Sequence, residues 1–104
     1  MKTIPELSFQ QTLPGCVNVR HIFPILTNRR DELKNFLTSK GIQTLIHYPY
    51  PIQRHPALAP DKMKVNQAII AEEVCLKELS MPLFPGLQTE EVDYICDTIA
   101  NFFN

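Results

Sequence analysis

Apolar and polar residues alternate along residues 16–27, the pattern of a strand that buries one of its two faces. One face carries Val17, Val19, His21 and Phe23. Pro24 interrupts the pattern and has no backbone N–H to donate, so it indicates an edge position or a bulge. Residues 1–15 are proline-bracketed and polar in the middle, which is typical of an extended lead-in, either a linker or an edge strand.

The pattern changes to a helical period after residue 28. Leu33, Phe36 and Leu37 follow the i, i+3, i+4 spacing of a buried helix stripe. Asn28 is a suitable N-cap, and the two acidic residues at 31 and 32 suit the positive end of the helix dipole. Gly41 tolerates the left-handed conformation that commonly ends a helix. These signals predict a helix over residues 29–40.

A second buried strand is predicted over residues 42–48, which are rich in β-branched and aliphatic side chains. Prolines at 49 and 51 cannot donate to a ladder, so the strand ends near Tyr48 and leaves His47 beside it at the strand's end. The prolines of the loop 49–64 exclude regular structure there. A loop of this length in a small domain is commonly functional or mobile.

The second half of the chain predicts helix, strand and helix. A helix over 65–78 is apolar around more than half of its circumference, which indicates cover on two sides and leaves open that one cover lies outside this chain. A short strand over 79–84 ends at a Pro-Gly pair, and Thr89 caps a final helix. The buried stripe of that last helix would consist of Val92, Ile95, Cys96, Ile99 and Phe103.

This order of elements predicts a two-layer α/β sandwich, with about three helices packed on a small sheet of three or four strands. Repeats and low-complexity runs are absent from the sequence. The predicted organisation is therefore a lead-in over residues 1–15 and one domain over residues 16–104.

Composition and charge narrow the function classes. With 10 basic and 11 acidic side chains spread along 104 residues, the net charge is −1, which argues against nucleic acid or an anionic membrane as the main partner. The chain has no apolar run near the ~20 residues of a membrane span, and its first residues lack the apolar core of a signal peptide. Three widely spaced cysteines favour reduced thiols in a cytoplasmic protein.

His47 and Tyr48 are the first candidates for chemistry, because strand ends are where a rigid scaffold presents functional side chains. One interpretation is a hydrogen-bonding pair at the rim of a binding cleft. The alternative is a histidine satisfied inside the sheet and a tyrosine packed under the proline-rich loop. The residues alone leave both open.

Other chemistry finds little support in the sequence. The three histidines, at 21, 47 and 55, are far apart and lack the paired spacing of a zinc site. Two of the cysteines fall on apolar helix faces, which favours core packing over a reactive thiol. Three scattered glycines make no phosphate loop, and neighbouring carboxylates on a helix diverge by ~100°. The motif chemistry therefore predicts no complete active site.

Five motifs, in order, resemble those of one enzyme family. They are residues 18–23 (NVRHIF), 30–33 with 40–42 (RDEL and KGI), 46–51 (IHYPYP), 71–73 with 79–87 (AEE and LSMPLFPGL) and 89–95 (TEEVDYI). The family is the DegT/DnrJ/EryC1/StrS sugar aminotransferases, pyridoxal-phosphate enzymes of the aspartate aminotransferase fold that act on nucleotide-linked keto-sugars. The resemblance covers roughly residues 16–103 and is to the family's C-terminal small domain, which implies a mostly antiparallel sheet.

The resemblance also implies what this chain lacks. In the family, the cofactor lysine lies in a large N-terminal domain, in a Ser-x-x-x-Lys-like setting, and transamination needs that lysine as a Schiff base. That setting is not found around Lys2, Lys34, Lys40, Lys62, Lys64 or Lys77. The chain is therefore expected to bind no pyridoxal phosphate and to be inactive alone. Its implied partners are a nucleotide-sugar substrate and the large cofactor-binding domain.

The same resemblance implies substrate-binding residues. His47 and Tyr48 match the family's HYPxP motif, which approaches the sugar and cofactor cleft, and Arg54 is a weaker anion contact. The family often continues with a second histidine, but Gln53 occupies that position here, and His55 falls where a glutamine is common. A rival hypothesis is a free-standing binding or regulatory module that forms a homodimer through the wide helix. A third is a fragment that folds without a function.

Overall fold

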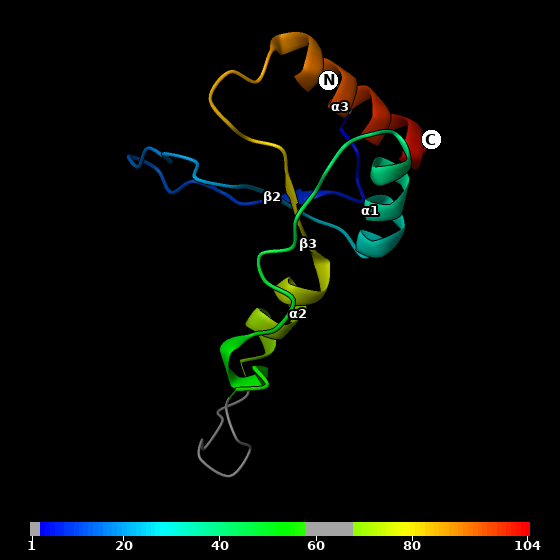
Figure 1. The fold of residues 1–104 in the computed structure, drawn as a ribbon. Coiled ribbons are helices and arrows are strands. Elements are labelled where there is room, and N and C mark those ends of the chain that lie inside the picture. Colours follow the sequence, from blue (N-terminus) through cyan, green and yellow to red (C-terminus); the bar gives the residue numbers. More distant parts are fainter. Residues whose placement is uncertain (1–2, 58–67) are drawn as a thin grey trace.

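The computed structural model describes residues 3–57 and 68–104. In chain order its elements are β1 (Ser8–Phe9), β2 (Phe23–Leu26), α1 (Arg30–Ser39), the 3₁₀ turn η1 (Ile52–Arg54), α2 (Ile69–Lys77), β3 (Glu78–Met81) and α3 (Thr89–Phe103) (Figure 1). The strands form one antiparallel sheet in the order β1-β2-β3. The predicted α/β class, with a small antiparallel sheet and three helices, is confirmed.

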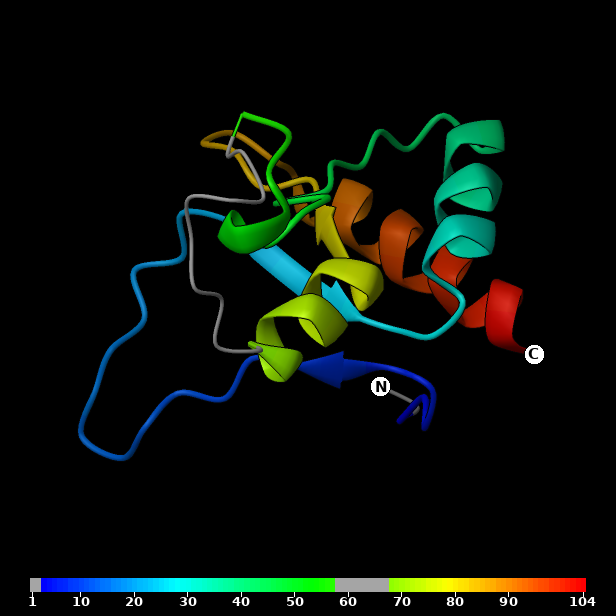
Figure 2. The ribbon, with the colours of Figure 1, turned by 90° about the horizontal axis from the view of Figure 1, so that it is seen from below.

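One hydrophobic core lies between the sheet and the helices α1 and α3, which pack against each other at an angle (Figure 2). The Phe36 ring of α1 meets the Phe102 ring of α3 at a centroid distance of 5.3 Å. The core consists of Ile25, Leu33, Leu37, Ile42, Leu79, Met81 and Ile99. Six of these residues come from β2, α1, β3 and α3, and Ile42 follows α1, so the core holds the four elements together.

The lead-in contributes to this body. Ser8 pairs with Leu26 and Phe9 with Ile25, which places β1 at the edge of the sheet. Ile4 and Leu7 also pack against the core.

The strand predicted over residues 16–27 is wrong for its first part, because only Phe23–Leu26 forms a strand. Val17 and Val19 are 91% and 93% exposed. An alternating face is buried only where a neighbouring strand and a covering layer exist, and in the described structure β2 pairs with its neighbours only from Phe23 onward.

Pro24 also lies elsewhere than predicted, because β2 is the central strand. The Thr27 N–H donates to the Lys77 carbonyl across the β2–β3 pair. Since alternate residues of a strand face opposite neighbours, the Pro24 nitrogen faces the β1 side. β1 pairs only with Ile25 and Leu26, so the missing N–H costs no ladder bond.

The strand predicted over residues 42–48 is wrong, since a single bridge between Leu45 and Ser80 is all that remains of it. The backbone groups at its two ends bond elsewhere. The Ile42 N–H donates to the Leu37 carbonyl and closes the end of α1, while the His47 N–H donates to a carboxylate oxygen of Glu78. Helix closure and a side-chain acceptor therefore replace the ladder.

Several predicted boundaries also shift. The N-caps of α1 and α3 are Arg29 and Gln88, each one residue from the predicted Asn28 and Thr89. β3 begins at Glu78 and ends at Met81, before Pro82. Residues 65–67 of the predicted helix and residues 58–64 of the predicted loop lie outside the described residues.

α2 extends away from the layer formed by α1 and α3 (Figure 1). None of its residues is buried, and Ile69, Ile70 and Leu76 are 66%, 79% and 69% exposed. Within residues 3–57 and 68–104, therefore, the two-sided cover predicted for this helix is not present. The helices of this same part are too short or too polar for any of them to cross a membrane.

Candidate functional site

The site starts from β3, all four of whose residues are buried. Successive residues of a strand face opposite sides, so Leu79 and Met81 enter the core while Glu78 and Ser80 share the other face. Glu78 is only 2% exposed, and Ser80 is 5% exposed. A carboxylate buried this deeply needs hydrogen-bond donors.

Two donors meet the Glu78 carboxylate. The backbone N–H of His47 donates to Oε2 at 2.6 Å, and the Ser80 hydroxyl donates to Oε1. The half-buried imidazole of His47 then contacts Ser80, with 2.8 Å between Nδ1 and Oγ. The histidine is thus held at both its backbone and its ring.

Tyr48 lies at the surface beside this histidine. Its side chain is 69% exposed, and its ring meets the His47 ring edge-on at a centroid distance of 5.4 Å. The two residues therefore form one unit, in which the histidine is anchored to β3 and the tyrosine is presented to solvent.

Arg54 lies on η1 and is bound to another element. Its Nε and Nη2 donate to the two carboxylate oxygens of Glu72 on α2, at 2.9 and 3.3 Å. This hydrogen bond and the charge of the guanidinium lower the pKa of Glu72, and the same pair raises the pKa of Arg54. Arg54 is therefore engaged with Glu72 rather than with His47 or Tyr48.

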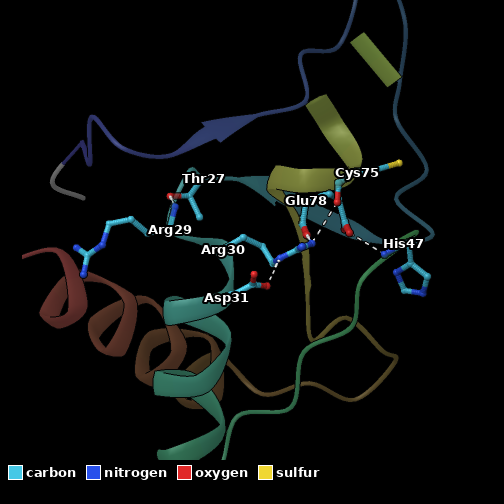
Figure 3. Close-up of polar contacts among 7 residues, drawn as sticks. All are labelled: Thr27, Arg29, Arg30, Asp31, His47, Cys75 and Glu78. Carbon is cyan, nitrogen blue, oxygen red and sulfur yellow. Dashed lines mark hydrogen bonds and ion pairs between the residues drawn. The ribbon is translucent and has the colours of Figure 1, made fainter. Parts of the chain in front are cut away.

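Arg30, in the first turn of α1, supports the site through backbone contacts. Its Nη1 reaches the carbonyl oxygens of Cys75 and Glu78, both at 3.2 Å, and its Nε donates to Asp31 at 2.6 Å (Figure 3). The side chain is 12% exposed. Arg30 thus joins the first turn of α1 to the junction of α2 and β3, which fixes the position of Glu78.

Sequence reasoning missed Glu78, Ser80 and Arg30. The helical pattern places Glu78 at the end of a helix, where a charged residue is usually exposed, so the sequence carries no signal of its burial. Ser80 alternates with Leu79 and Met81, a pattern that predicts a solvated polar face and gives no signal of burial either. Arg30 has no signal, because its partners are backbone carbonyls 45 and 48 positions away.

A hollow of about 380 Å³ lies apart from these residues, between β1, the end of β2 and α2. Its charged lining is Glu6, Glu73 and Lys77, and the ammonium of Lys77 is paired with Glu73. That ion pair lowers the pKa of Glu73. Two carboxylates and one paired ammonium do not suit a dianionic phosphate, so these residues do not fit pyridoxal phosphate.

In the part of the chain that the structure describes, no three His, Cys, Asp or Glu side chains are grouped so that they could hold a metal ion. His47 and Tyr48 can themselves supply hydrogen bonding and proton exchange at an imidazole and a phenol.

Comparison with solved structures shows the class of protein. The fold superimposes on S. venezuelae DesV, solved in complex with a ketimine intermediate, with a TM-score of 0.88 and 30% identity. The alignment covers 97% of this chain and 27% of that chain. The described elements thus have the fold of one part of an aminotransferase.

Comparison of sequences identifies the family. The profile of the DegT/DnrJ/EryC1/StrS aminotransferase family matches residues 1–100, and the chain belongs to this family. It is 37% identical over 89 residues to a pleiotropic regulatory protein of Geobacillus stearothermophilus, covering 86% of this chain and 24% of the relative. It is 33% identical over 99 residues to the dTDP-3-amino-3,4,6-trideoxy-alpha-D-glucose transaminase of Streptomyces venezuelae, covering 95% and 26%. The chain spans about a quarter of the length of the relatives it matches.

Proposed function

We propose that this chain is the C-terminal small domain of a pyridoxal-phosphate-dependent aminotransferase that acts on a nucleotide-linked keto-sugar, and that it works in the cytoplasm. The domain is proposed to occupy residues 16–104, with residues 1–15 as a lead-in that adds the edge strand β1 to its sheet. The observation that carries the proposal is the likeness to DesV, in which nearly the whole of this fold corresponds to about a quarter of an enzyme chain. The domain closes the substrate side of a site whose cofactor is held by another domain.

His47 and Tyr48 are proposed to contact the sugar. The imidazole is held against β3 by Ser80, which supports a fixed hydrogen-bonding direction, and the exposed Tyr48 side chain is accessible to a ligand. Arg54 is a weaker contact for an anionic group, since an anion has to compete with Glu72 for its guanidinium.

The cofactor is proposed to bind elsewhere in the enzyme. Lys77 is paired with Glu73, and its hollow does not suit a phosphate, so no step of the reaction is assigned to the described residues of this chain. Purified chain mixed with pyridoxal phosphate and reduced with borohydride is expected to carry no stoichiometrically modified lysine. A single lysine labelled to completion would contradict the proposal that the chain is inactive alone.

A chimera tests the site. The matched quarter of the S. venezuelae transaminase is replaced by this chain, and kcat and KM are measured for that enzyme's own substrate. His47→Ala and Tyr48→Phe are expected to raise KM, while Tyr50→Phe, at a neighbouring tyrosine that is 55% exposed, leaves it unchanged. A chimera that binds cofactor and turns over with all three variants unaffected would contradict the assignment of His47 and Tyr48.

The second candidate function is a free-standing binding or regulatory module. The similarity to a protein named as a pleiotropic regulator and the exposed apolar side chains of α2 favour it. Such a module would form a homodimer through α2 or bind a partner there. Analytical ultracentrifugation discriminates, because a strict monomer at all concentrations counts against the dimer.

A further inference from the structure

The buried cluster of Glu78, Ser80 and His47 determines where the hydrogen of the imidazole lies. The Glu78 carboxylate accepts two hydrogen bonds, one from the His47 backbone N–H and one from the Ser80 hydroxyl. A serine hydroxyl has a single hydrogen, and that hydrogen is used toward Glu78. Toward His47, Ser80 can therefore act only as an acceptor.

The contact of 2.8 Å between Ser80 Oγ and His47 Nδ1 then requires the hydrogen to be on Nδ1. In a neutral ring this leaves a lone pair on Nε2. Among residues 3–57 and 68–104, Nε2 makes no hydrogen bond. The imidazole lies on the outer side of the cluster, away from α1 (Figure 3).

We infer that Glu78 is a positioning residue that acts through Ser80 to hold His47 in the Nδ1–H form, so that Nε2 is presented as a hydrogen-bond acceptor. The same carboxylate accepts from the backbone N–H of His47, so both the position of the ring and its tautomer depend on Glu78. The ligand group that Nε2 accepts from is a donor, and a sugar hydroxyl is such a group. That last step rests on the proposed function, whereas the tautomer does not.

The variant Glu78→Gln reverses the donor pattern with almost no change in shape. The carbonyl of the new side-chain amide has to face the His47 N–H, because an amide NH₂ there would oppose another donor. The NH₂ then donates to Ser80, whose hydrogen turns toward Nδ1 and moves the ring hydrogen to Nε2. Ser80→Ala removes the acceptor altogether, and the ring is expected to adopt the Nε2–H form that free histidine prefers in water.

The experiment records ¹⁵N chemical shifts of ¹⁵N-histidine-labelled chain at alkaline pH, where the imidazole is neutral. The full chain is expected to show mainly Nδ1–H at His47, and E78Q and S80A mainly Nε2–H. Glu90→Gln, at an exposed glutamate on α3, removes the same charge elsewhere and is expected to keep Nδ1–H. Backbone amide shifts of β3 show whether each variant remains folded.

An Nε2–H ring in the unmodified chain, or an unchanged tautomer in folded E78Q, would overturn the inference. If E78Q does not fold, the His47 tautomer in the unmodified chain and in S80A tests the inference. An Nδ1–H ring in both of these would also overturn the inference. In the chimera, E78Q is expected to raise KM about two- to tenfold, the size of one neutral hydrogen bond. A tautomer that reverses as expected beside an unchanged KM contradicts the claim that Nε2 accepts a substrate hydrogen bond and leaves the positioning role standing.

Discussion

The residues of β3 face two different environments, one on each side of the strand. Leu79 and Met81 complete the apolar core, while Glu78 and Ser80, on the opposite face, organise a polar cluster with His47. A buried carboxylate is tolerated only when donors surround it, and removal of one partner leaves an uncompensated charge. At this strand, stability and site geometry therefore depend on neighbouring residues.

Leu79 gives the first prediction. Its side chain is 0% exposed, so Leu79→Ala leaves a cavity between the sheet and the helices and should lower the free energy of unfolding by about 2–5 kcal/mol. Urea denaturation followed by circular dichroism measures the change. Leu76→Ala, at a leucine that is 69% exposed, should stay within about 0.5 kcal/mol. Equal losses for the two variants would contradict the core assignment.

At the scale of elements, the long amphipathic helices were the most predictable. The stripe Leu33–Leu37 and the glycine after it predicted α1 to within a residue, and Gly41 has the expected positive φ of 78°. Residues 16–22 and 42–48 could not be predicted in the same way. Their apolar patterns suit strands, but a strand exists only where a partner backbone accepts its hydrogen bonds, and that depends on distant residues.

The residues of the candidate site also divide into those that local sequence signals predict and those that depend on distant contacts. The end of the segment 42–48 pointed to His47 and Tyr48 from local signals, the proline stop above all. Their supports on β3 and α1 are set by tertiary contacts more than 30 positions away in the chain, which no local pattern contains. The assignment of these residues to a substrate remains a prediction.

The N-terminus of α3 gives the second prediction. Gln88 and Glu91 form a capping box in which the Gln88 N–H donates to the Glu91 carboxylate at 2.8 Å. Glu91→Ala should destabilise the chain by about 1 kcal/mol because it frees this donor. Glu90→Ala is the control, since it removes the same charge from the same helix turn without touching the box. Thermal unfolding compares them, and a Glu90→Ala loss as large as that of Glu91→Ala would show that charge alone matters.

The link between η1 and α2 gives the third prediction, on pH. Because Arg54 lowers the pKa of Glu72, the ion pair contributes above the ordinary pKa of a glutamate and is lost as the pH falls through the lowered value. Both groups are exposed, so the effect on global stability is small. Arg54→Gln should return the pKa of Glu72 toward its ordinary range, measured by carboxyl ¹³C shifts in a pH titration. The pKa of Glu73, which Lys77 lowers, should stay the same in this variant. An unchanged pKa of Glu72 would refute its pairing with Arg54.

The whole molecule is less compact than its length allows. Its radius of gyration is 15.9 Å, against about 13 Å for a compact domain of 100 residues. The segment between β1 and β2 and the region of α2 both extend from the core (Figures 1 and 2). Apolar side chains are exposed on both of these extensions, including Val17, Val19, Ile69 and Ile70.

The exposed surface of α2 gives the fourth prediction. The chain alone should enhance the fluorescence of an apolar dye such as ANS, because contiguous exposed apolar residues bind such probes. Ile70→Glu, at a residue that is 79% exposed, should reduce this signal and leave the free energy of unfolding within about 0.5 kcal/mol. Thr89→Glu adds the same charge at an exposed position on α3 and should keep the signal. A signal insensitive to Ile70→Glu would contradict the assignment of α2 as the surface that binds the dye.

The pairing of β2 with β3 has a consequence for how the chain acquires its shape. Ile25 and Leu79 are direct neighbours in the sheet, yet about half of the chain lies between them. α1 can form early from local contacts, but the central pairing has to close a very long loop first, and such topologies fold slowly. During synthesis, Ile25 stays without its partner until β3 has left the ribosome, so this core cannot be completed before residue 79 is available.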